Sequence, residues 1–388
     1  MSSIMQALYN SVSGLFSFSQ TLNVISNNVS NMNTPGFRGN DAFLENVVGD
    51  NGSKVAGTGH NLGEGQIQQT GTSTHVAIDG KGLFVLQDSD GTIYYTRSGE
   101  FQFNEQGVLV DSVNHYRVMG YATDGSYGEI DISSLQMLPA QASSSISMAG
   151  NLDPTTPSNT INNISVYDAQ GNQHVLSAVL TSNVTVTPGS WLVSVQDSGG
   201  TTLGSGEIRF STDGTLAAGF TTVNATGNWG ASEQALTFDF GTAGGLSGTT
   251  AFSGITATLA AQVKDGRGVV GVSSQVFDTA GTLQLTYSDG ETKSGPQLAL
   301  ATFPDESSLQ MIQGNLYLQP KTQIAQIGRP GQTIFGKIEG GSLEMSNVDL
   351  TQELANMIVI QRGYQASSRV MTVSSDMLEQ LYDSTRGS

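Results

Sequence analysis

The four histidines are the residues of this sequence with the most obvious capacity for metal chemistry. His60, His75, His115 and His174 lie far apart, without the four-residue spacing that places two histidines on one face of a helix to bind a metal. The chain contains no cysteine, which excludes disulfides and thiolate ligands. The sequence therefore predicts no metal site and no cofactor.

Two short segments resemble binding loops but lack an essential residue. Residues 88–91 (DSDG) resemble the start of a calcium loop, yet the twelfth loop position, which should be acidic, is Gly99. We favour a β-hairpin turn there. Residues 241–245 (GTAGG) are not followed by the Lys-Ser or Lys-Thr pair of a phosphate loop. No G-x-S-x-G motif occurs, and although a Ser-His-Asp arrangement of distant residues stays open, we expect no catalytic residues and no enzyme.

The composition limits the kinds of partner that this protein can bind. The 388 residues include 33 acidic and 15 basic ones, giving a net charge of -18, and no cluster of Lys and Arg suits nucleic acid. No apolar run approaches the roughly 20 residues that a membrane-spanning helix needs. The first residues also lack the basic and unbroken apolar regions of a cleaved secretory signal peptide. We therefore expect neither nucleic-acid binding nor membrane insertion.

The two ends of the sequence carry helical periodicity. In the first 32 residues, apolar side chains recur every three or four positions, as on one face of a helix, and a Thr-Pro-Gly turn at 34–36 ends the pattern. This face comprises Ile4, Leu8, Val12, Leu15, Phe18, Leu22, Ile25, Val29 and Met32. A second apolar stripe begins near residue 350, after a possible N-cap at Asn347 or Asp349. Its seven-residue repeat is typical of a coiled coil: Leu350, Met357, Tyr364, Met371 and Leu378, flanked by Leu354, Ile360, Val370, Met377 and Leu381.

The middle of the chain reads as short strands and turns. Apolar runs at 82–86, 93–95 and 297–303 are separated by Gly-containing turns, which predicts antiparallel β-structure. The Ser-, Thr- and Pro-rich stretch 142–163 is expected to be a linker, and Gly266-Arg267-Gly268 the return crossing. The fold class expected is mainly β, with long helical termini that pair as a coiled coil and one antiparallel β domain inserted in another.

The first 37 residues are unusual because they contain no Asp, Glu, Lys, Arg or His. A solvent-exposed helix usually carries charges on its outer face, whereas Ser and Asn can be buried at moderate cost when they find hydrogen-bond partners. Burial of nine apolar side chains contributes roughly 14–27 kcal/mol as an upper bound. Ordering about 29 residues costs on the order of 43 kcal/mol. We therefore expect this helix to need a partner helix and neighbouring subunits.

Several motifs, in order along the chain, resemble the rod and hook proteins of the bacterial flagellum. The N-terminal signature is residues 28–38 (NVSNMNTPGFR), and residues 79–85 (DGKGLFV) with 95–101 (YTRSGEF) resemble the shared β core. Residues 343–350 (LEMSNVDL) and 361–366 (QRGYQA) resemble the C-terminal signature. The residues that carry the two terminal signatures are Asn28, Asn31, Asn33, Thr34, Gly36, Phe37, Asn347, Asp349, Gln361 and Arg362.

Within this family, residues 164–174 (ISVYDAQGNQH) open a segment similar to the outer β domain of hook proteins, which favours hook over rod. The resemblance implies four regions. These are a terminal helical domain (1–32 and 349–388), a connecting segment (33–70 and 325–348), a first β domain (71–149 and 267–324) and an inserted outer β domain (150–266).

The resemblance also implies a function, partners and a location. The chain would be the structural subunit of a helical homopolymer, a flexible tube that acts as a universal joint between the motor and rod and the filament. It would meet rod, hook cap and hook-filament junction proteins, and leave the cell through the flagellar type III export apparatus without a cleaved signal peptide. Its location would be extracellular, at the hook of the flagellum. The assembly seam would comprise Leu8, Leu15, Phe18, Leu22, Ile25, Val29, Leu350, Leu354, Met357, Tyr364, Met371 and Leu378.

Two other functions stay open at this point. A distal rod or other axial segment of the flagellum would share the helices but lack the outer β domain. A secreted β-rich enzyme or adhesin would instead present a pocket with convergent polar groups and would not need its terminal helices.

Overall fold

The structure is a computed structural model that describes residues 2–47, 52–229, 233–312, 315–320 and 322–386. The chain divides into two compact units. Unit 1 contains residues 1–134, 273–286 and 292–388, and unit 2 contains residues 135–272 and 287–291.

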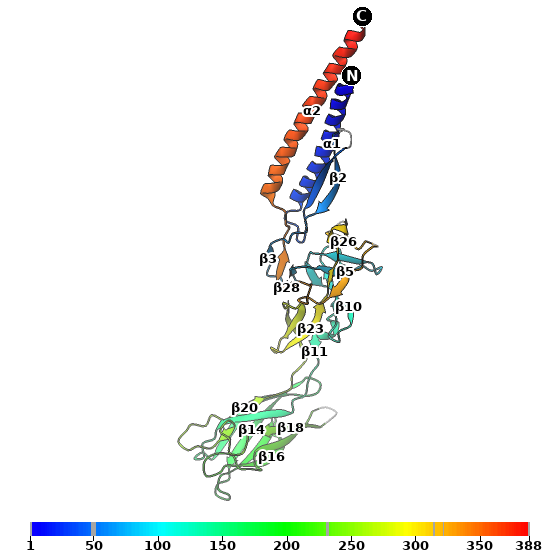
Figure 1. Ribbon diagram of the computed structural model, residues 1–388. Helices are drawn as coiled ribbons and strands as arrows, with labels where there is room; N and C mark the ends of the chain where they lie inside the picture. Colours follow the sequence, from blue (N-terminus) through cyan, green and yellow to red (C-terminus); the bar gives the residue numbers. More distant parts are fainter. Residues whose placement is uncertain (1, 48–51, 230–232, 313–314, 321, 387–388) are drawn as a thin grey trace. The chain divides into compact units, whose positions relative to one another are not determined.

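Two helices of unit 1 come from the ends of the described chain. Helix α1 spans Ser2–Ser30 and helix α2 spans Leu350–Arg386, close to the bounds that their apolar periodicity predicts. The N-cap of α2 is Asp349, because its Oδ1 accepts hydrogen bonds from the backbone N–H groups of Thr351 and Gln352. Figure 1 draws α1 in blue and α2 in orange to red, lying side by side.

The strands of unit 1 form one large sheet and three small two-stranded sheets. The large sheet contains the path β22-β23-β9-β5-β6-β26-β25, and the small ones pair β1 with β2, β28 with β4 and β29 with β3, all antiparallel. The strands are β1 Asn40–Asn46, β2 Ser53–His60, β3 Ile67–Gln69, β4 Val76–Asp79, β5 Leu83–Gln87, β6 Ile93–Thr96, β7 Phe101–Phe103, β8 Leu109–Asp111, β9 Arg117–Tyr121, β10 Tyr127–Glu129, β22 Thr282–Tyr287, β23 Thr292–Leu298, β24 Leu300–Thr302, β25 Gln310–Ile312, β26 Leu316–Leu318, β27 Gln326–Gly328, β28 Lys337–Gly340 and β29 Ser342–Glu344.

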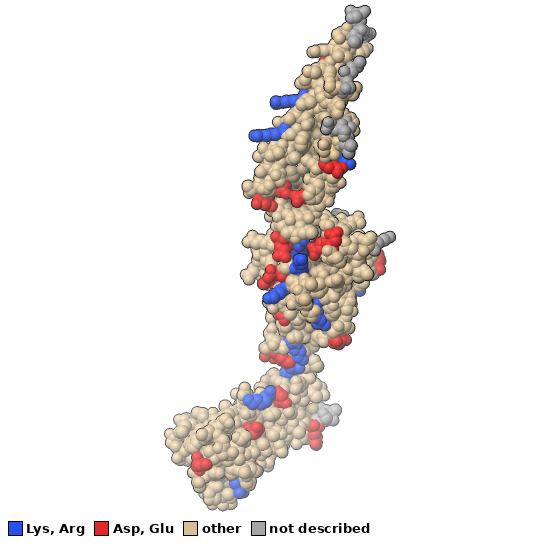
Figure 2. Space-filling view, in the orientation of Figure 1, with Lys and Arg blue, Asp and Glu red and all other residues tan. Residues whose placement is uncertain are grey.

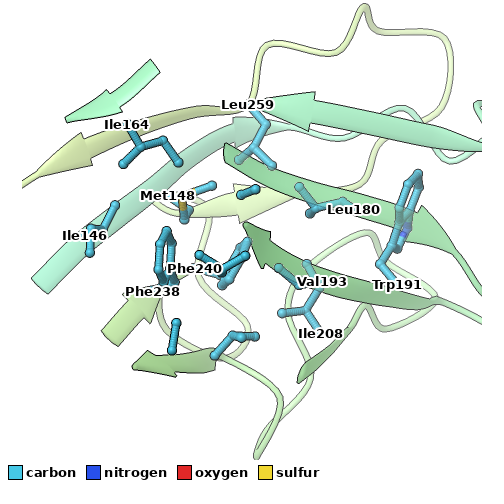
Figure 3. Close-up of a cluster of buried hydrophobic side chains, with 14 of the residues drawn as sticks. Ile146, Met148, Ile164, Leu180, Trp191, Val193, Ile208, Phe238, Phe240 and Leu259 are labelled. Atoms are coloured by element: carbon cyan, nitrogen blue, oxygen red, sulfur yellow. The ribbon is translucent and has the colours of Figure 1, made fainter. Parts of the chain in front are cut away.

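Unit 2 contains a four-stranded sheet, β13-β14-β15-β16, and a five-stranded sheet built around β12. Their buried side chains meet in one apolar core, which Figure 3 shows around Met148, Phe238, Val193 and Trp191. The strands are β11 Met137–Leu138, β12 Ser145–Asn151, β13 Ser158–Tyr167, β14 Gln173–Ser182, β15 Ser190–Asp197, β16 Thr202–Arg209, β17 Thr222–Asn228, β18 Glu233–Asp239, β19 Thr249–Thr250 and β20 Ala260–Val263. Strand β21, Val270–Phe277, has residues in both units, and so does β22, whose last residue, Tyr287, belongs to unit 2.

The structure corrects the prediction of a linker at 142–163. Strands β12 and β13 occupy most of that stretch, and Ile146 and Met148 of β12 are fully buried in the core of unit 2. Apolar residues at alternate positions are enough to form a strand although Ser and Thr stand between them, because a strand needs only one apolar face. Strand β12 also runs parallel to β18 and β19, an exception to the antiparallel pairing predicted.

The apolar run at 297–303 is also not one strand. It is divided into the end of β23 and the short strand β24, and the two pair with different neighbours. Strand β23 pairs with β9, whereas β24 pairs with β5 and β27. A run that is buried on both faces has no alternation to mark where one strand ends and the next begins.

Candidate assembly surface

Several hydroxyl groups on α1 are hydrogen-bonded within the chain. Ser11, Ser17 and Thr21 each donate to the backbone carbonyl four residues earlier, at distances of 2.6, 3.0 and 2.9 Å. Ser17 also donates to the carbonyl of Ser53 in β2, at 2.7 Å. A hydroxyl bonded in this way can lie against other polypeptide without being left unpaired.

Helices α1 and α2 contact each other through small and aromatic residues. A Cβ atom added at Gly14 would lie 3.1 Å from Ser367 Oγ, and one added at Gly363 would lie 2.7 Å from Cζ of Phe18. Near the junction with the strands, Asn28 Nδ2 donates to Glu353 Oε1 at 2.7 Å. The glycines therefore allow the two helices to approach closely at two successive places.

A groove of about 280 Å³ runs beside this contact. Its walls are mostly apolar, with Phe18 and Leu22 contributed by α1 and Ile360 and Tyr364 by α2. Grooves between helices of this kind accept apolar side chains from another helix.

The outer surface of α2 is rich in exposed apolar side chains. Figure 2 shows few Lys, Arg, Asp and Glu side chains over the visible face of the two helices. Large exposed apolar patches mark sites of interaction with other molecules. The exposed members on α2 are Leu350, Leu354, Ile358, Val359, Tyr364, Val370, Met371, Val373, Met377, Leu381 and Tyr382, and on α1 they are Met5, Tyr9 and Phe16.

The structure divides the predicted seam residues between two environments. On α1, Ile25 is buried and the others, Leu8, Leu15, Phe18, Leu22 and Val29, are half-buried. On α2, Met357 and Leu378 are half-buried, whereas Leu350, Leu354, Tyr364 and Met371 are exposed. The seven-residue repeat of α2 therefore lies partly beside α1 and partly on open surface.

The signature residues join the end of α1 to the segment before α2. Asn28 is buried; its Nδ2 donates to the carbonyl of Asn40 at 2.8 Å and its Oδ1 accepts from the N–H of Asn40 at 2.9 Å. Asn347 accepts from the N–H of Gly39 at 2.8 Å and donates to the carbonyls of Asn61 and Gly63. These amide side chains thus bind backbone groups that lie next to the two signatures.

The turn after α1 requires a glycine. Gly36 has φ +69°, and a Cβ there would lie 2.4 Å from the backbone nitrogen of Ser98. Its N–H donates to the carbonyl of Glu344 at 2.8 Å, and Phe37 beside it is buried. Thr34 donates to Asn31 Oδ1 at 3.2 Å within the turn. Asn33, Gln361 and Arg362 are exposed.

Sequence reasoning missed a buried ion pair at this junction. Arg97 Nε binds Glu344 Oε2, and both side chains are almost fully buried. The other guanidinium nitrogens donate to the carbonyls of Gly82 at 2.6 Å and Ile78 at 2.8 Å. Glu344 Oε1 accepts from the N–H of Gly65 at 2.9 Å. Both charged residues lie in the signature motifs, which was the available signal.

The segments with possible metal or calcium chemistry have other roles in the structure. Residues 88–92 form the turn of the β5–β6 hairpin, in which Asp88 Oδ1 accepts from the N–H groups of Asp90 and Thr92. His174 lies 2.9 Å from Asp168 and this hydrogen bond holds the pKa of Asp168 well below its usual range. Within the described ranges, no three His, Asp or Glu side chains are grouped to hold a metal ion.

Among the described helices, none is both long and apolar enough to cross a membrane.

Family models for axial proteins of the flagellum match four stretches of the chain in sequence order. Residues 8–38 match the flagella basal body rod protein family, and residues 77–153 match the D1 domain of flagellar hook protein FlgE/F/G. Residues 137–267 match the D2 domain of flagellar basal body protein FlaE, and residues 339–383 match the C-terminal region of flagellar basal body rod FlgEFG proteins.

Curated relatives match over nearly the whole chain. Flagellar hook protein FlgE of Escherichia coli is 31% identical over 97% of this chain and 99% of its own length. The FlgE of Salmonella typhimurium is 30% identical over 95% of this chain and 98% of its own. The crystal structure of Helicobacter pylori FlgE2 covers 72% of this chain and all of its own, with 13% identity and a TM-score of 0.48.

The helical termini, the β units and these matches together define a structural protein of the flagellar axis. Within that class, the chain belongs to the flagellar hook protein family. It is a structural subunit of the flagellar hook, as its sequence motifs predicted.

Proposed function

We propose that this subunit polymerises into a flexible tube that acts as a universal joint between the rod and the filament. The observation that carries the proposal is the exposed apolar surface of α2, which extends along the helix from Leu350 to Tyr382. Exposure of so many apolar side chains to water is unfavourable and favours association with further copies of the chain. The proposed role is mechanical and includes no catalytic step, metal or cofactor.

The terminal helices would pair as a coiled coil at the inner wall of the tube. Support comes from the close approach at Gly14 and Gly363, and from the half-buried residues on the inner face of α1. The exposed seam residues Leu354, Tyr364 and Met371 would contact helices of neighbouring subunits. In this arrangement the seam has two parts, one within the subunit and one between subunits.

The β regions would lie at larger radius and slide when the tube bends. We propose the four-region organisation that the sequence predicts, with residues 150–266 as the inserted outer β domain. The compact unit of residues 135–272 supports this division, as does the backbone pairing of Gln141 with Arg267, which brings its two ends together. Few charges on this unit would leave few ion pairs to break during sliding.

The partners would be further copies of this chain, the rod, the hook cap and the hook-filament junction proteins. We propose export through the flagellar type III apparatus, without cleavage of a signal peptide. The matches to rod and hook families support these partners only as members of the same axial structure.

Electron microscopy of the purified full-length chain tests the proposal directly. We expect curved tubes, because a joint must bend in every direction as it rotates. Straight tubes would instead favour a rod segment, and a protein that stays monomeric under polymerising conditions would contradict self-assembly.

A further inference from the structure

A small cavity in unit 1 has four polar or charged residues in a wall that is otherwise apolar. Its volume is about 10 Å³. It lies where the segment after α1 meets the β-strands of the same unit. The lining residues are Arg38, His60, Leu62, Leu83, Glu306, Leu309 and Tyr317.

Three buried polar atoms in this wall have no hydrogen-bond partner among the described residues. They are Nε of Arg38, Nδ1 of His60 and the hydroxyl oxygen of Tyr317. Arg38 Nη1 donates to the carbonyl of Leu62 at 3.1 Å, but this bond leaves Nε unpaired. The rings of His60 and Tyr317 meet edge to face with centroids 6.0 Å apart. Buried polar atoms are almost always bonded, so three around one cavity point to a shared ligand.

We propose that one ordered water molecule occupies this cavity and bonds all three atoms. The water oxygen accepts from the Arg38 Nε–H and from the Tyr317 hydroxyl, and one water hydrogen is donated to His60 Nδ1. His60 is neutral in this arrangement and carries its proton on Nε2. The volume is close to the minimum that one water requires, and three polar partners are the number that buried waters typically have.

The charges around the cavity favour a neutral ligand over an ion. Arg38 Nη1 lies 3.7 Å from Glu306 Oε2, so the two charges nearest the cavity offset each other. Burial, with the Arg38 guanidinium as a second cause, lowers the pKa of His60 and keeps its ring uncharged. An anion would face the Glu306 carboxylate and a cation would face Arg38. Water is the ligand that meets neither repulsion.

The water would connect two parts of unit 1 that are distant in sequence. Arg38 precedes the β1–β2 hairpin and His60 is its last residue, whereas Glu306 and Tyr317 belong to the C-terminal part of the β structure. The proposed water would thus link the segment after α1 to the β-strands through hydrogen bonds.

A high-resolution structure of the full-length chain tests the site. We expect one density peak about 2.7–3.2 Å from Arg38 Nε, His60 Nδ1 and Tyr317 Oη. Crystals or tubes prepared with bromide in place of chloride separate water from an anion, because bromide gives an anomalous signal. A cavity without density, or one that contains bromide, would overturn the proposal.

A solution measurement provides a second test. Magnetic relaxation dispersion counts long-lived internal waters, and we expect one fewer in the double variant His60→Leu with Tyr317→Phe, because only Arg38 Nε of the three proposed partners remains and a buried water needs two to four. Tyr95→Phe is the matched control, since the Tyr95 hydroxyl already donates to Gln319 at 3.0 Å. Equal counts for the wild type and the double variant would contradict the site. If that variant does not fold, the density in the wild type decides.

Discussion

Arg97 and Glu344 illustrate at the residue scale why a buried charge must keep its partner. The guanidinium has the Glu344 carboxylate and two carbonyls around it, so each of its three nitrogens is bonded. The carboxylate in turn binds the N–H of Gly65. The pair therefore holds together segments near residues 65, 80, 97 and 344. Removal of one partner would leave the other as a buried charge without a counter-charge.

We predict that Glu344→Gln destabilises unit 1 by about 3–5 kcal/mol, because Arg97 would be left as an unpaired buried charge. Calorimetry of the monomer would measure this loss. Both tryptophans, Trp191 and Trp229, lie in unit 2, so their fluorescence reports on that unit and should be unchanged.

The exposed ion pair between Glu45 and Lys54 provides the matched control. Glu45→Gln should change the free energy of unfolding by at most about 1 kcal/mol. If Glu344→Gln and Glu45→Gln lowered the free energy of unfolding equally, the buried ion pair would stabilise the protein no more than the exposed one.

His60 should make the stability of unit 1 depend on pH. Its pKa is lowered in the folded protein from an ordinary value of 6.5, so the unfolded chain binds a proton more readily than the folded one. The free energy of unfolding should therefore decrease as the pH falls below about 6.5, and continue to decrease until His60 is protonated in the folded state as well. The charged or titratable groups that face it are Arg38, Glu306 and Tyr317.

Urea unfolding of the monomer from pH 7.5 to 4.5 would measure this dependence. His60→Gln should remove part of the decrease, whereas His115→Asn, a substitution at an exposed loop position with φ +58°, should leave it intact. A pH profile unaffected by His60→Gln would rule out this histidine as the cause.

At the scale of elements, the contact between α1 and α2 depends on how Phe18 lies over Gly363. Replacing Gly by Ala in a helix stabilises it by about 1 kcal/mol. A methyl group at 363 would, however, come within 3.0 Å of three atoms of the Phe18 ring, and overpacking costs about 1–3 kcal/mol. The unfavourable contact should therefore cancel or exceed the gain in helix propensity.

We predict that Gly363→Ala alone leaves the melting temperature of assembled tubes unchanged or lowers it. In a Phe18→Leu background, the same substitution should raise that temperature, because the shorter side chain removes the collision. A double-mutant cycle on the four proteins measures the coupling. Additive effects would show that the ring and the glycine do not constrain each other.

Leu22 tests whether the groove beside the helix contact is covered in the tube. Leu22→Lys would place an ammonium group among Phe18, Ile360 and Tyr364, where it has no carboxylate partner in the groove lining. We expect loss of assembly with the β-strands still folded, because burial of an unpaired charge costs several kcal/mol and repeats in every subunit. Electron microscopy and circular dichroism would measure the two properties, with Ser89→Lys in an exposed turn as the control.

At the scale of the whole molecule, we expect unit 2 to affect the curvature and stiffness of the tube more than the ability of the subunits to assemble. Residues Gln141 and Arg267 exchange backbone hydrogen bonds of 2.9 and 2.8 Å, so a short Gly-Ser turn can replace residues 142–266 between them. We predict tubes with altered curvature and stiffness, measured by electron microscopy and by thermal fluctuation of their contours. A shortened chain that folds but never polymerises would contradict this division between helices and β units.

The sequence predicted the elements with strong periodicity and missed features that depend on distant residues. Both helices follow from apolar spacing, and Asp349 was one of two expected N-caps. Strand β12 was mistaken for a linker because its Ser-rich composition hides two buried apolar positions. The Arg97–Glu344 pair joins residues 247 positions apart, and no local pattern reports such a contact.

The serines and threonines of α1 have a consequence for the conditions under which the hook can work. Helix α1 contains no Asp, Glu, Lys, Arg or His, so near neutral pH it brings no charge of its own to its contacts. Changes in ionic strength therefore have little electrostatic effect on this surface, whereas charged side chains such as Arg362 on α2 are open to screening. In a bacterium that swims from fresh into saline water, screening would weaken contacts between charged side chains more than the contacts of α1.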